Sequence, residues 1–439
     1  MKRITKGFFA LSTLALLLPL GAQAAEPSNA TPEGYQLEQV LIFSRHGIRA
    51  PLVGYGDILA ESTPHQWPVW KTEGGLLTPK GAEVETLFGK YMRDWLAQTG
   101  ILPAKGCPTA GSVFVYANSL PRTIDTAKSF VSGAFPECSL KVNHQEKVGT
   151  MDPTFNPIIT AKVTDEFKQK AIESINQHAG PGGIDGLNER LKPNYAVLQQ
   201  VMDYGQSKVC SEKKTCSLAD QPNTVNIVQD KEPGITGPLR VGTGASDGFM
   251  LQYYEGYPLK DVAWGQITDE KQWQQLEEIK NLYHETLFGS SAVAQNAAAP
   301  LMRFVSATLV GTPDTNALAA DAHIAKVAVL VGHDSNIASL LAAMKTAPYD
   351  LPKQYEKTPI SGKIVFQRWH DKKDNRDLMK IEYVYQSTDQ IRNATPLSLP
   401  TPAQRVILQI DGCKIDANGF CPKQDIKAAI AKEIKGEKY

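Results

Sequence analysis

The residues best suited to chemistry are Arg45, His46 and Arg49, which come directly after the apolar run 40–43. Arginine side chains are forked donors whose geometry matches the oxygens of a carboxylate or a phosphate. A histidine between them can attack an electrophile that the arginines hold. The same pattern would also fit a strand end with surface arginines and a hydrogen-bonded histidine, so the rest of the chain has to decide between the two interpretations.

Two further polar turns follow apolar runs in the same way. Arg122 follows the run 113–116, and His333 and Asp334 follow the run 324–331. Because the carboxyl ends of parallel strands lie at one edge of a sheet, we expect all these side chains to meet in one pocket. Taken singly, Arg122 could be a surface residue and Asp334 the N-cap of the helix that follows it.

Together, these groups supply what a phosphomonoester hydrolase without a metal requires. His46 would attack phosphorus to form a phosphohistidine, and Asp334 would protonate the leaving oxygen and later act as the base for water. The cations for the non-bridging oxygens would be Arg45, Arg49, Arg122 and His333. An unperturbed aspartic acid titrates near ~3.9, and nearby arginines hold the pKa of a histidine below ~6.5. The sequence therefore predicts activity in mild acid.

A metal site is the other chemistry that a His-Asp dipeptide could indicate. Such a site would need further histidine or carboxylate ligands at regular spacing. The remaining histidines show no such spacing; they are His65, His144, His178, His284, His323 and His370. We therefore predict neither a metal nor another cofactor.

The stretch from Arg45 to Pro51, Arg-His-Gly-x-Arg-x-Pro, and the pair His333-Asp334 resemble the two signatures of the histidine acid phosphatases. The resemblance extends over essentially all of the chain after its N-terminal leader. It implies a histidine-phosphatase-like (phosphoglycerate-mutase-like) α/β domain with a mixed sheet, and a mostly helical second domain over the cleft. It also implies that His46 is the nucleophile and Asp334 the proton donor. The phosphate-binding residues that it implies are Arg45, Arg49, Arg122 and His333.

Within the family, several stretches resemble members that hydrolyse glucose 1-phosphate, namely 116–120, 144–147, 151–157, 251–256 and 331–336. Phytases of the family typically have threonine after His-Asp, where this chain has Ser335, and often a fourth disulfide, for which no cysteines remain. The expected substrate is therefore glucose 1-phosphate, with phytate or a broad range of phosphomonoesters as the alternative. A periplasmic sugar-phosphate-binding protein is a remote alternative. The Gln177–Leu187 region looks extended relative to these members.

Three residues are candidates for contact with the leaving group. Glu232 lies on a Pro-Gly turn, where its carboxylate could accept hydrogen bonds from sugar hydroxyls and would disfavour highly phosphorylated substrates. It could equally be a solvated turn residue. Trp67 and Trp70 could stack on a sugar ring, but tryptophans are at least as often packed in a core.

The first 24 residues have the pattern of a cleaved export signal. Lys2, Arg3 and Lys6 precede an apolar core at 7–20, and an Ala-Gln-Ala site ends at Ala24. The core is too short to cross a membrane, so we expect a soluble periplasmic protein. With 46 basic and 46 acidic residues, the chain has no basic excess for a nucleic acid or an anionic membrane. The expected partner is a small phosphomonoester, and the chain could be a monomer or a homodimer.

Six cysteines in an exported chain suggest disulfides rather than a metal site, which would favour clustered Cys-x-x-Cys spacing. The connectivity is not fixed by the sequence. Short loop closure favours pairing Cys107 with Cys138, Cys210 with Cys216, and Cys413 with Cys421. Strand-like runs occur near both ends of the chain and helical patterns between them. We therefore expect a discontinuous α/β domain of residues 25–150 and 295–439 around a mostly helical domain of residues 151–294.

Overall fold

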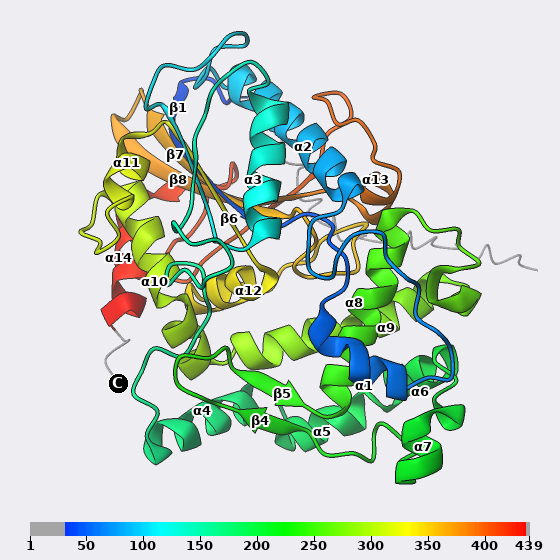
Figure 1. Ribbon diagram of the computed structural model, residues 1–439. Helices are drawn as coiled ribbons and strands as arrows, with labels where there is room; N and C mark the ends of the chain where they lie inside the picture. The colour runs from blue at the N-terminus through cyan, green and yellow to red at the C-terminus, as the bar shows by residue number, and fades with distance from the viewer. Residues whose placement is uncertain (1–30, 436–439) are drawn as a thin grey trace, which may run out of the picture.

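The computed structural model describes residues 31–435, so the predicted export signal of residues 1–24 lies outside the described residues. Its larger sheet has eight strands in the order β10-β8-β7-β1-β6-β2-β3, with β9 paired to β8 (Figure 1). These strands are β1 (Tyr35–Arg45), β2 (Val113–Ala117), β3 (Val142–Asn143), β6 (Val327–Gly332), β7 (Lys363–Asp371), β8 (Arg376–Tyr385), β9 (Gln404–Ile407) and β10 (Cys421–Pro422). A separate two-stranded sheet consists of β4 (Thr224–Asn226) and β5 (Gly234–Thr236).

The central strands of the larger sheet are parallel and end together. β1 pairs with β6, and β6 with β2, so that Arg45 lies opposite Gly332 and Ala117 opposite Val331. On the other side of β1, β7 and β8 form the antiparallel hairpin that two alternating sequence runs predict. The sheet is therefore mixed, and the three turns that carry the candidate residues leave it at one edge.

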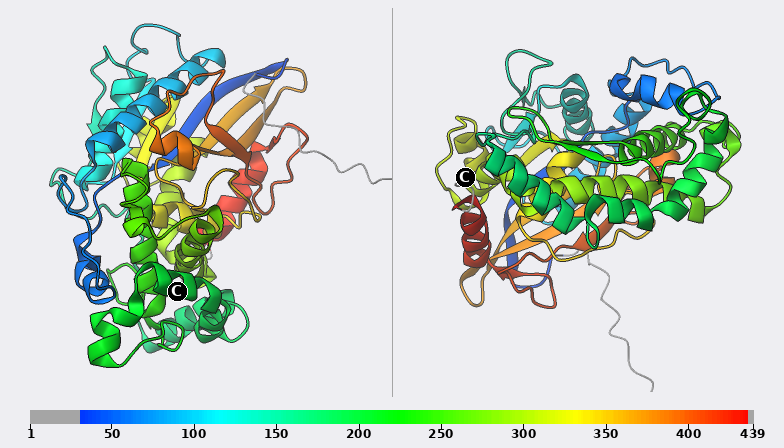
Figure 2. Two further views of the ribbon diagram at one scale, coloured as in Figure 1. Left: turned by 90° about the vertical axis from the view of Figure 1, so that its right-hand side faces the viewer. Right: turned by 90° about the horizontal axis from the view of Figure 1, so that it is seen from below.

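Helices cover both faces of this sheet (Figures 1 and 2). One face is covered by α2 (Pro79–Gln98) and α3 (Pro121–Ala134), and the other by α10 (Ser291–Val310), α11 (Ala319–Ile324), α12 (Asp334–Ala343) and α14 (Lys423–Lys435). In β1, Leu41 and Phe43 belong to one apolar core, and Val40 and Ile42 to the other. The run 40–43 is continuously apolar because the strand is covered on both faces.

The middle of the chain forms a second group of helices with an apolar core of its own (Figure 1). These helices are α4 (Asp165–His178), α5 (Gly183–Arg190), α6 (Lys192–Val201), α7 (Lys208–Lys213), α8 (Pro238–Glu255) and α9 (Glu270–Phe288), with short 3₁₀ turns η2 (Tyr204–Gln206) and η3 (Val262–Gly265). From earlier in the chain, η1 (Val53–Tyr55) and α1 (Gly56–Glu61) lie with this group, since α1 contacts α8. The predicted boundary at 294/295 falls inside α10, and the division into domains stays a prediction.

Local sequence signals explain the ends of several elements. Thr78 caps α2 by accepting a hydrogen bond from the backbone N–H of Gly81, with Pro79 in the first turn, as the sequence predicts. Arg122 lies in the first turn of α3 rather than in the loop before it. The sequence of residues 423–439 predicts a solvated helix, whereas α14 buries one side, with Ile426 and Ile430 in the core that it shares with α10. The remaining short helix is α13 (Thr388–Arg392).

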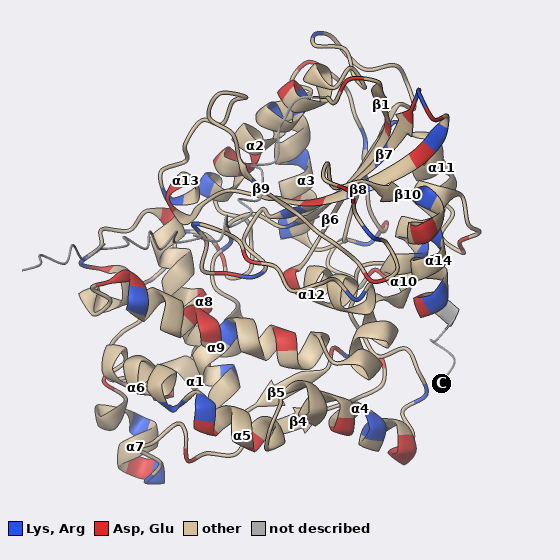
Figure 3. Cartoon of the chain, turned by 180° about the vertical axis from the view of Figure 1, so that it is seen from behind, with Lys and Arg blue, Asp and Glu red and all other residues tan. Residues whose placement is uncertain are grey.

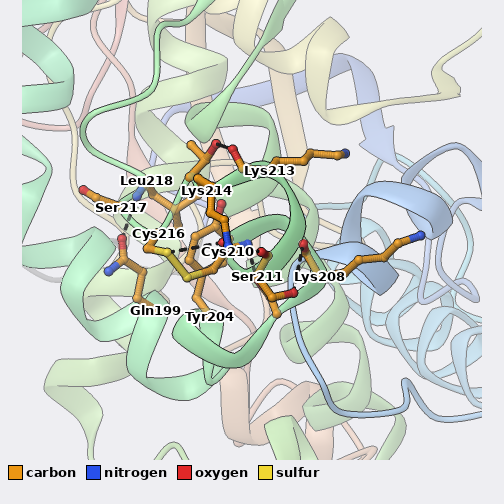
Figure 4. Close-up of a disulfide and its surroundings, with 12 residues drawn as sticks. Gln199, Tyr204, Lys208, Cys210, Ser211, Lys213, Lys214, Cys216, Ser217 and Leu218 are labelled. Atoms are coloured by element: carbon orange, nitrogen blue, oxygen red, sulfur yellow. Dashed lines mark hydrogen bonds between the residues drawn. A yellow bond between two sulfur atoms is a disulfide. The ribbon is translucent and has the colours of Figure 1, made fainter.

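Three disulfides are present, and each joins the two cysteines nearest in sequence: Cys107 with Cys138, Cys210 with Cys216, and Cys413 with Cys421. Figure 4 shows the second, which closes the loop after α7. Next to it, the side chain of Gln199 accepts a hydrogen bond from the backbone N–H of Leu218 (2.7 Å). The disulfide therefore fixes a loop that also binds to α6.

Figure 3 shows the chain from behind, with acidic and basic residues interspersed along the helices and strands. Between residues 31 and 435, the longest helices are too polar or too short to cross a bilayer.

Candidate active site

A cavity of about 710 Å³ lies where the turns after β1, β2 and β6 face α8 and α9. Six of the residues that the sequence singled out line it: His46, Arg49, Arg122, Glu232, His333 and Asp334. Arg45 is fully buried in the wall behind Asp334 instead of lining the cavity. The parallel register of the three strands is what brings together residues almost 300 positions apart in the chain.

His46 is held at the end of β1 with one ring nitrogen free to react. Its backbone N–H donates to the carbonyl oxygen of Gly332 (3.0 Å), and its Nδ1 lies 2.9 Å from the carbonyl oxygen of Gly47. Because a carbonyl oxygen only accepts, Nδ1 carries the proton and Nε2 is unprotonated. Burial, and after it the charge of Arg122, holds the pKa of His46 well below its usual value. The ring is therefore neutral in mild acid, as a nucleophile has to be.

His333 connects two other side chains of the site. Its backbone N–H donates to Asn336 Oδ1 (2.9 Å), and a Cβ on Gly332 would come within 2.6 Å of that oxygen, so glycine is needed before it. The His333 ring lies 2.6 Å from the Asn118 side-chain amide and 3.3 Å from the Arg122 guanidinium. Burial and the charge of Arg122 lower the pKa of His333 to about 3. The neutral ring therefore holds Arg122 in place at the cavity wall.

Asp334 is the first residue of α12, and both of its carboxylate oxygens are engaged. Oδ1 accepts the backbone N–H of Ser335 (2.8 Å), and Oδ2 forms an ion pair with Arg45 (3.0 Å). Burial alone would raise the pKa of Asp334, but Arg45 outweighs it and holds the pKa well below its usual value. The assumption of an unperturbed aspartic acid is therefore wrong for the free protein, in which Asp334 is ionised even in mild acid.

His284, which the sequence analysis set aside with the other histidines, also lies beside Asp334. Its Nδ1 lies 3.0 Å from the carbonyl oxygen of Lys280, and its Nε2 lies 3.9 Å from Asp334 Oδ2. Burial lowers the pKa of His284, so the ring does not add a full charge to the site at neutral pH. In the sequence, only the spacing of His284 one helical turn after Lys280 could have indicated that it lies at the site.

Both arginines of the first signature have carboxylate partners that the sequence analysis missed. Arg49 donates to Asp247 Oδ2 (3.0 Å), and Arg45 donates to Glu356 Oε1 (2.9 Å). Burial opposes ionisation of Asp247, yet the charge of Arg49 lowers its pKa to about 2. These partners come from α8 and from the loop after α12, so each guanidinium is held by a part of the chain that is far from it in sequence.

The side of the cavity away from the sheet carries groups suited to a leaving group. Glu232 lines it near the solvent, and burial, together with the nearby charge of Asp334, raises the pKa of Glu232 to about 7. The same side of the cavity also carries the positive charge of Arg240. The Arg240 guanidinium lies 4.6 Å from the centre of the Tyr55 ring, and both residues line the cavity. This rim therefore offers hydrogen-bond donors, an acceptor and an aromatic face.

The two tryptophans considered for sugar stacking lie elsewhere. Trp67 stacks on Phe249 with 5.2 Å between ring centres, and Trp70 lies 5.3 Å from the ring of Tyr257. Neither lines the cavity, and both pack against the core of the helical part. The packing alternative is therefore the one that the structure supports.

Within residues 31–435, no group of three or more histidine, cysteine or carboxylate side chains is arranged so that it could hold a metal ion. Asp334, Asp247 and Glu356 are instead paired with arginine or lysine.

A mixed sheet covered by helices on both faces, with a buried histidine and arginines at the ends of its parallel strands, defines a phosphatase of the histidine type. The chain belongs to the histidine phosphatase superfamily (branch 2), whose family model matches residues 36–386. It is 50% identical to a glucose-1-phosphatase of Salmonella typhimurium over 93% of this chain and 94% of that relative. It is 42% identical to a glucose-1-phosphatase of Providencia rettgeri over 96% and 97%. Among solved structures, a Hafnia alvei phytase in complex with tartrate is similar, with a TM-score of 0.85, 30% identity and coverage of 92% of this chain and 98% of that one.

Proposed function

We propose that this protein is a periplasmic acid phosphomonoesterase that hydrolyses glucose 1-phosphate to glucose and phosphate. The observation that supports it most directly is the neutral, buried His46 with its free Nε2 in a cavity that arginines and Asp334 also line. The choice of glucose 1-phosphate is supported by the two relatives named as glucose-1-phosphatases. Export is supported by the leader pattern of residues 1–24 and by the three disulfides.

The reaction would begin with the phosphate oxygens bound by Arg49 and Arg122 at the cavity wall, with Arg45 behind them. Nε2 of His46 attacks phosphorus, the N–P bond forms, and the bond from phosphorus to the sugar oxygen breaks. Asp334 gives its proton to the departing oxygen, so glucose leaves as a neutral alcohol. Water then attacks the phosphohistidine while Asp334 takes its proton, which regenerates neutral His46 and releases phosphate.

The pH dependence would come from the proton on Asp334. In the free protein Arg45 keeps this carboxyl ionised, whereas bound phosphate oxygens add negative charge beside it and draw on the same arginines. The complex therefore favours protonation of Asp334, and a singly ionised phosphomonoester supplies the proton. Phosphomonoesters lose their second proton near ~6, so activity should fall as the pH rises through that value.

The first test compares phosphate release from glucose 1-phosphate and phytate between pH 4 and pH 8, with EDTA present throughout. We expect release from both without loss in EDTA, a higher kcat/KM for glucose 1-phosphate, and a decline in rate above pH ~6. Preference for phytate would keep the mechanism and overturn the proposed substrate. No release from either compound would overturn the proposed enzyme.

The alternative is a phytase with the same mechanism. It is favoured by the similarity to the Hafnia alvei phytase, which extends over 98% of that chain. The cavity of about 710 Å³, with Arg240 at its rim, would also admit a leaving group larger than glucose. The same comparison of substrates decides between the two.

We expect Glu232 to control the choice between singly and multiply phosphorylated substrates. Because the pKa of Glu232 is raised to about 7, the side chain is mostly protonated at pH 5 and repels additional phosphates only as it ionises. In Glu232→Gln, the ratio of kcat/KM for phytate to that for glucose 1-phosphate should be nearly unchanged at pH 5. At pH 7.5 it should rise about tenfold, which corresponds to ~1.4 kcal/mol of relieved repulsion.

The control for this variant is Glu212→Gln, an exposed glutamate in α7 far from the cavity. Steady-state kinetics on both substrates at the two pH values provide the measurement. A substrate ratio in Glu232→Gln that matches wild type at both pH values would show that Glu232 is only a solvated turn residue.

A further inference from the structure

Lys280 is a buried charge that the proposed mechanism does not use. It lies in the middle of α9, its side chain is only 3% exposed, and it is one of the residues that line the cavity. Burying an ammonium group is costly unless carboxylates compensate it. The contacts of Lys280 therefore indicate which groups it positions.

Three carboxylates from different parts of the chain surround the Lys280 Nζ. It lies 2.7 Å from Glu356 Oε1, 3.3 Å from Asp247 Oδ1 and 3.7 Å from Glu277 Oε2. Burial lowers the pKa of Lys280, but these carboxylates raise it by more. The net pKa is raised, so the ammonium keeps its charge. Glu356 is also bound by the hydroxyl of Tyr254, which donates to Oε2 (3.0 Å).

Two of these carboxylates are the partners of the signature arginines. The other oxygen of Asp247 binds Arg49 (3.0 Å), and the same oxygen of Glu356 binds Arg45 (2.9 Å). Arg45 in turn binds Asp334 (3.0 Å). The charges therefore alternate in one chain of contacts, which runs from Arg49 through Asp247, Lys280, Glu356 and Arg45 to Asp334.

We propose that Lys280 is a positioning residue, which holds the two carboxylates that orient the guanidiniums of Arg45 and Arg49 for the phosphoryl group. This inference rests on the proposed phosphatase function and deepens it. The lysine joins the partners of both arginines, so one group on α9 sets the position of Arg45 at the end of β1 and of Arg49 just after it. The remaining neighbour, Glu277, has a pKa raised by burial and is neutral in mild acid, so the alternating chain carries three positive and three negative charges.

Loss of the ammonium would leave Asp247 and Glu356 with one cation each. Burial raises the pKa of Glu356, while Lys280 and then Arg45 lower it, and the net result is a lowered pKa. Without Lys280 the pKa of Glu356 rises, so the carboxylate is protonated at a higher pH and its hold on Arg45 is lost. Activity should therefore decline at a higher pH on the acid side than it does in wild type.

The test compares Lys280→Met, which removes the charge at similar length, with Lys280→Arg, which keeps it. The matched control is Lys271→Met, the same substitution at an exposed position of the same helix. We expect kcat/KM for glucose 1-phosphate at pH 5 to fall about 100-fold in Lys280→Met, because small displacements of positioning groups have effects of this size. Lys280→Arg should retain most of the activity, and Lys271→Met all of it.

Two measurements separate positioning from a purely structural role. The first is the pH profile of kcat/KM, whose acid side should move to higher pH in Lys280→Met but not in Lys280→Arg. The second is calorimetric binding of inorganic phosphate, which should weaken about tenfold in Lys280→Met. Circular dichroism and thermal unfolding identify the temperature range in which each variant is folded, and the assays are made within it.

The inference is overturned if folded Lys280→Met keeps kcat/KM within threefold of wild type. It is also overturned if Lys280→Met and Lys280→Arg lose activity equally at every pH, because the loss would then not depend on the charge. Failure of the proposed function has a different signature, namely a wild-type protein that releases no phosphate from any ester. In that case phosphate binding still tests whether Lys280 positions the arginines.

Discussion

His46→Ala is expected to abolish turnover of glucose 1-phosphate while the protein still binds phosphate. Loss of the nucleophile in other enzymes lowers kcat by on the order of 10⁴-fold or more, since no other group can form the covalent intermediate. The phosphate-binding groups are separate side chains, and Arg49 keeps its contact with Asp247 whether or not the imidazole is present. Steady-state release of phosphate and calorimetric binding of inorganic phosphate measure the two properties independently.

A rapid-mixing experiment with wild type adds direct evidence for the intermediate. Labelled phosphate should remain attached to protein that is denatured in alkali, in which the N–P bond of a phosphohistidine survives, and should be lost in acid. His144→Ala is the control, because His144 is outside the cavity and bonds to its neighbouring backbone. Attachment of the label to His46→Ala, or turnover within tenfold of wild type, would contradict a nucleophilic role of His46.

The sequence predicted most of the site because the motifs follow apolar strands. Arg45 and His46, Arg122, and His333 each come after a run that has to be buried, and parallel strands place such ends side by side. The register that aligns Arg45 with Gly332 shows that this inference holds in three dimensions. The sequence could not show that Arg45 lies buried behind Asp334, because that depends on where its carboxylate partners lie.

The charged residues behind the site were missed for a physical reason. Asp247 and Glu356 lie in a helix and a loop whose local patterns are ordinary, and their role arises only from tertiary contact. A weak signal did exist in α9. Glu277, Lys280 and His284 are polar at helical spacing on a face that also carries Leu276. Charged residues within a buried stripe indicate paired charges, and this spacing would have pointed to the site.

The fold was predicted most accurately where one pattern determines one element. The alternating runs of β7 and β8 and the capped start of α2 correspond to single local rules. The short strands β4 and β5 were missed because three residues are too few to show a period. The burial of one side of α14 was missed because its sequence is rich in charged residues. That Ile426 and Ile430 are buried follows only from the tertiary contact between α14 and α10.

Asp334→Asn is expected to slow the reaction by an amount that depends on the leaving group. General acid catalysis contributes about 10²–10⁴-fold when the leaving oxygen is a poor anion, as in glucose 1-phosphate. A nitrophenolate is stable as an anion and needs little protonation, so formation of the phosphohistidine from p-nitrophenyl phosphate should be far less affected. Asparagine keeps an oxygen for the backbone N–H of Ser335, so the start of α12 is preserved.

The second step distinguishes this role from simple damage to the site. Asp334 is also the proposed base for water, so the phosphohistidine should form and then persist in Asp334→Asn. Stopped-flow absorbance should therefore show a burst of nitrophenol close to one equivalent of protein, followed by slow turnover. Asp374→Asn, at an exposed position, should behave like wild type. Equal losses with both substrates and no burst would mean that Asp334 serves mainly to hold Arg45, through the ion pair of 3.0 Å that joins them.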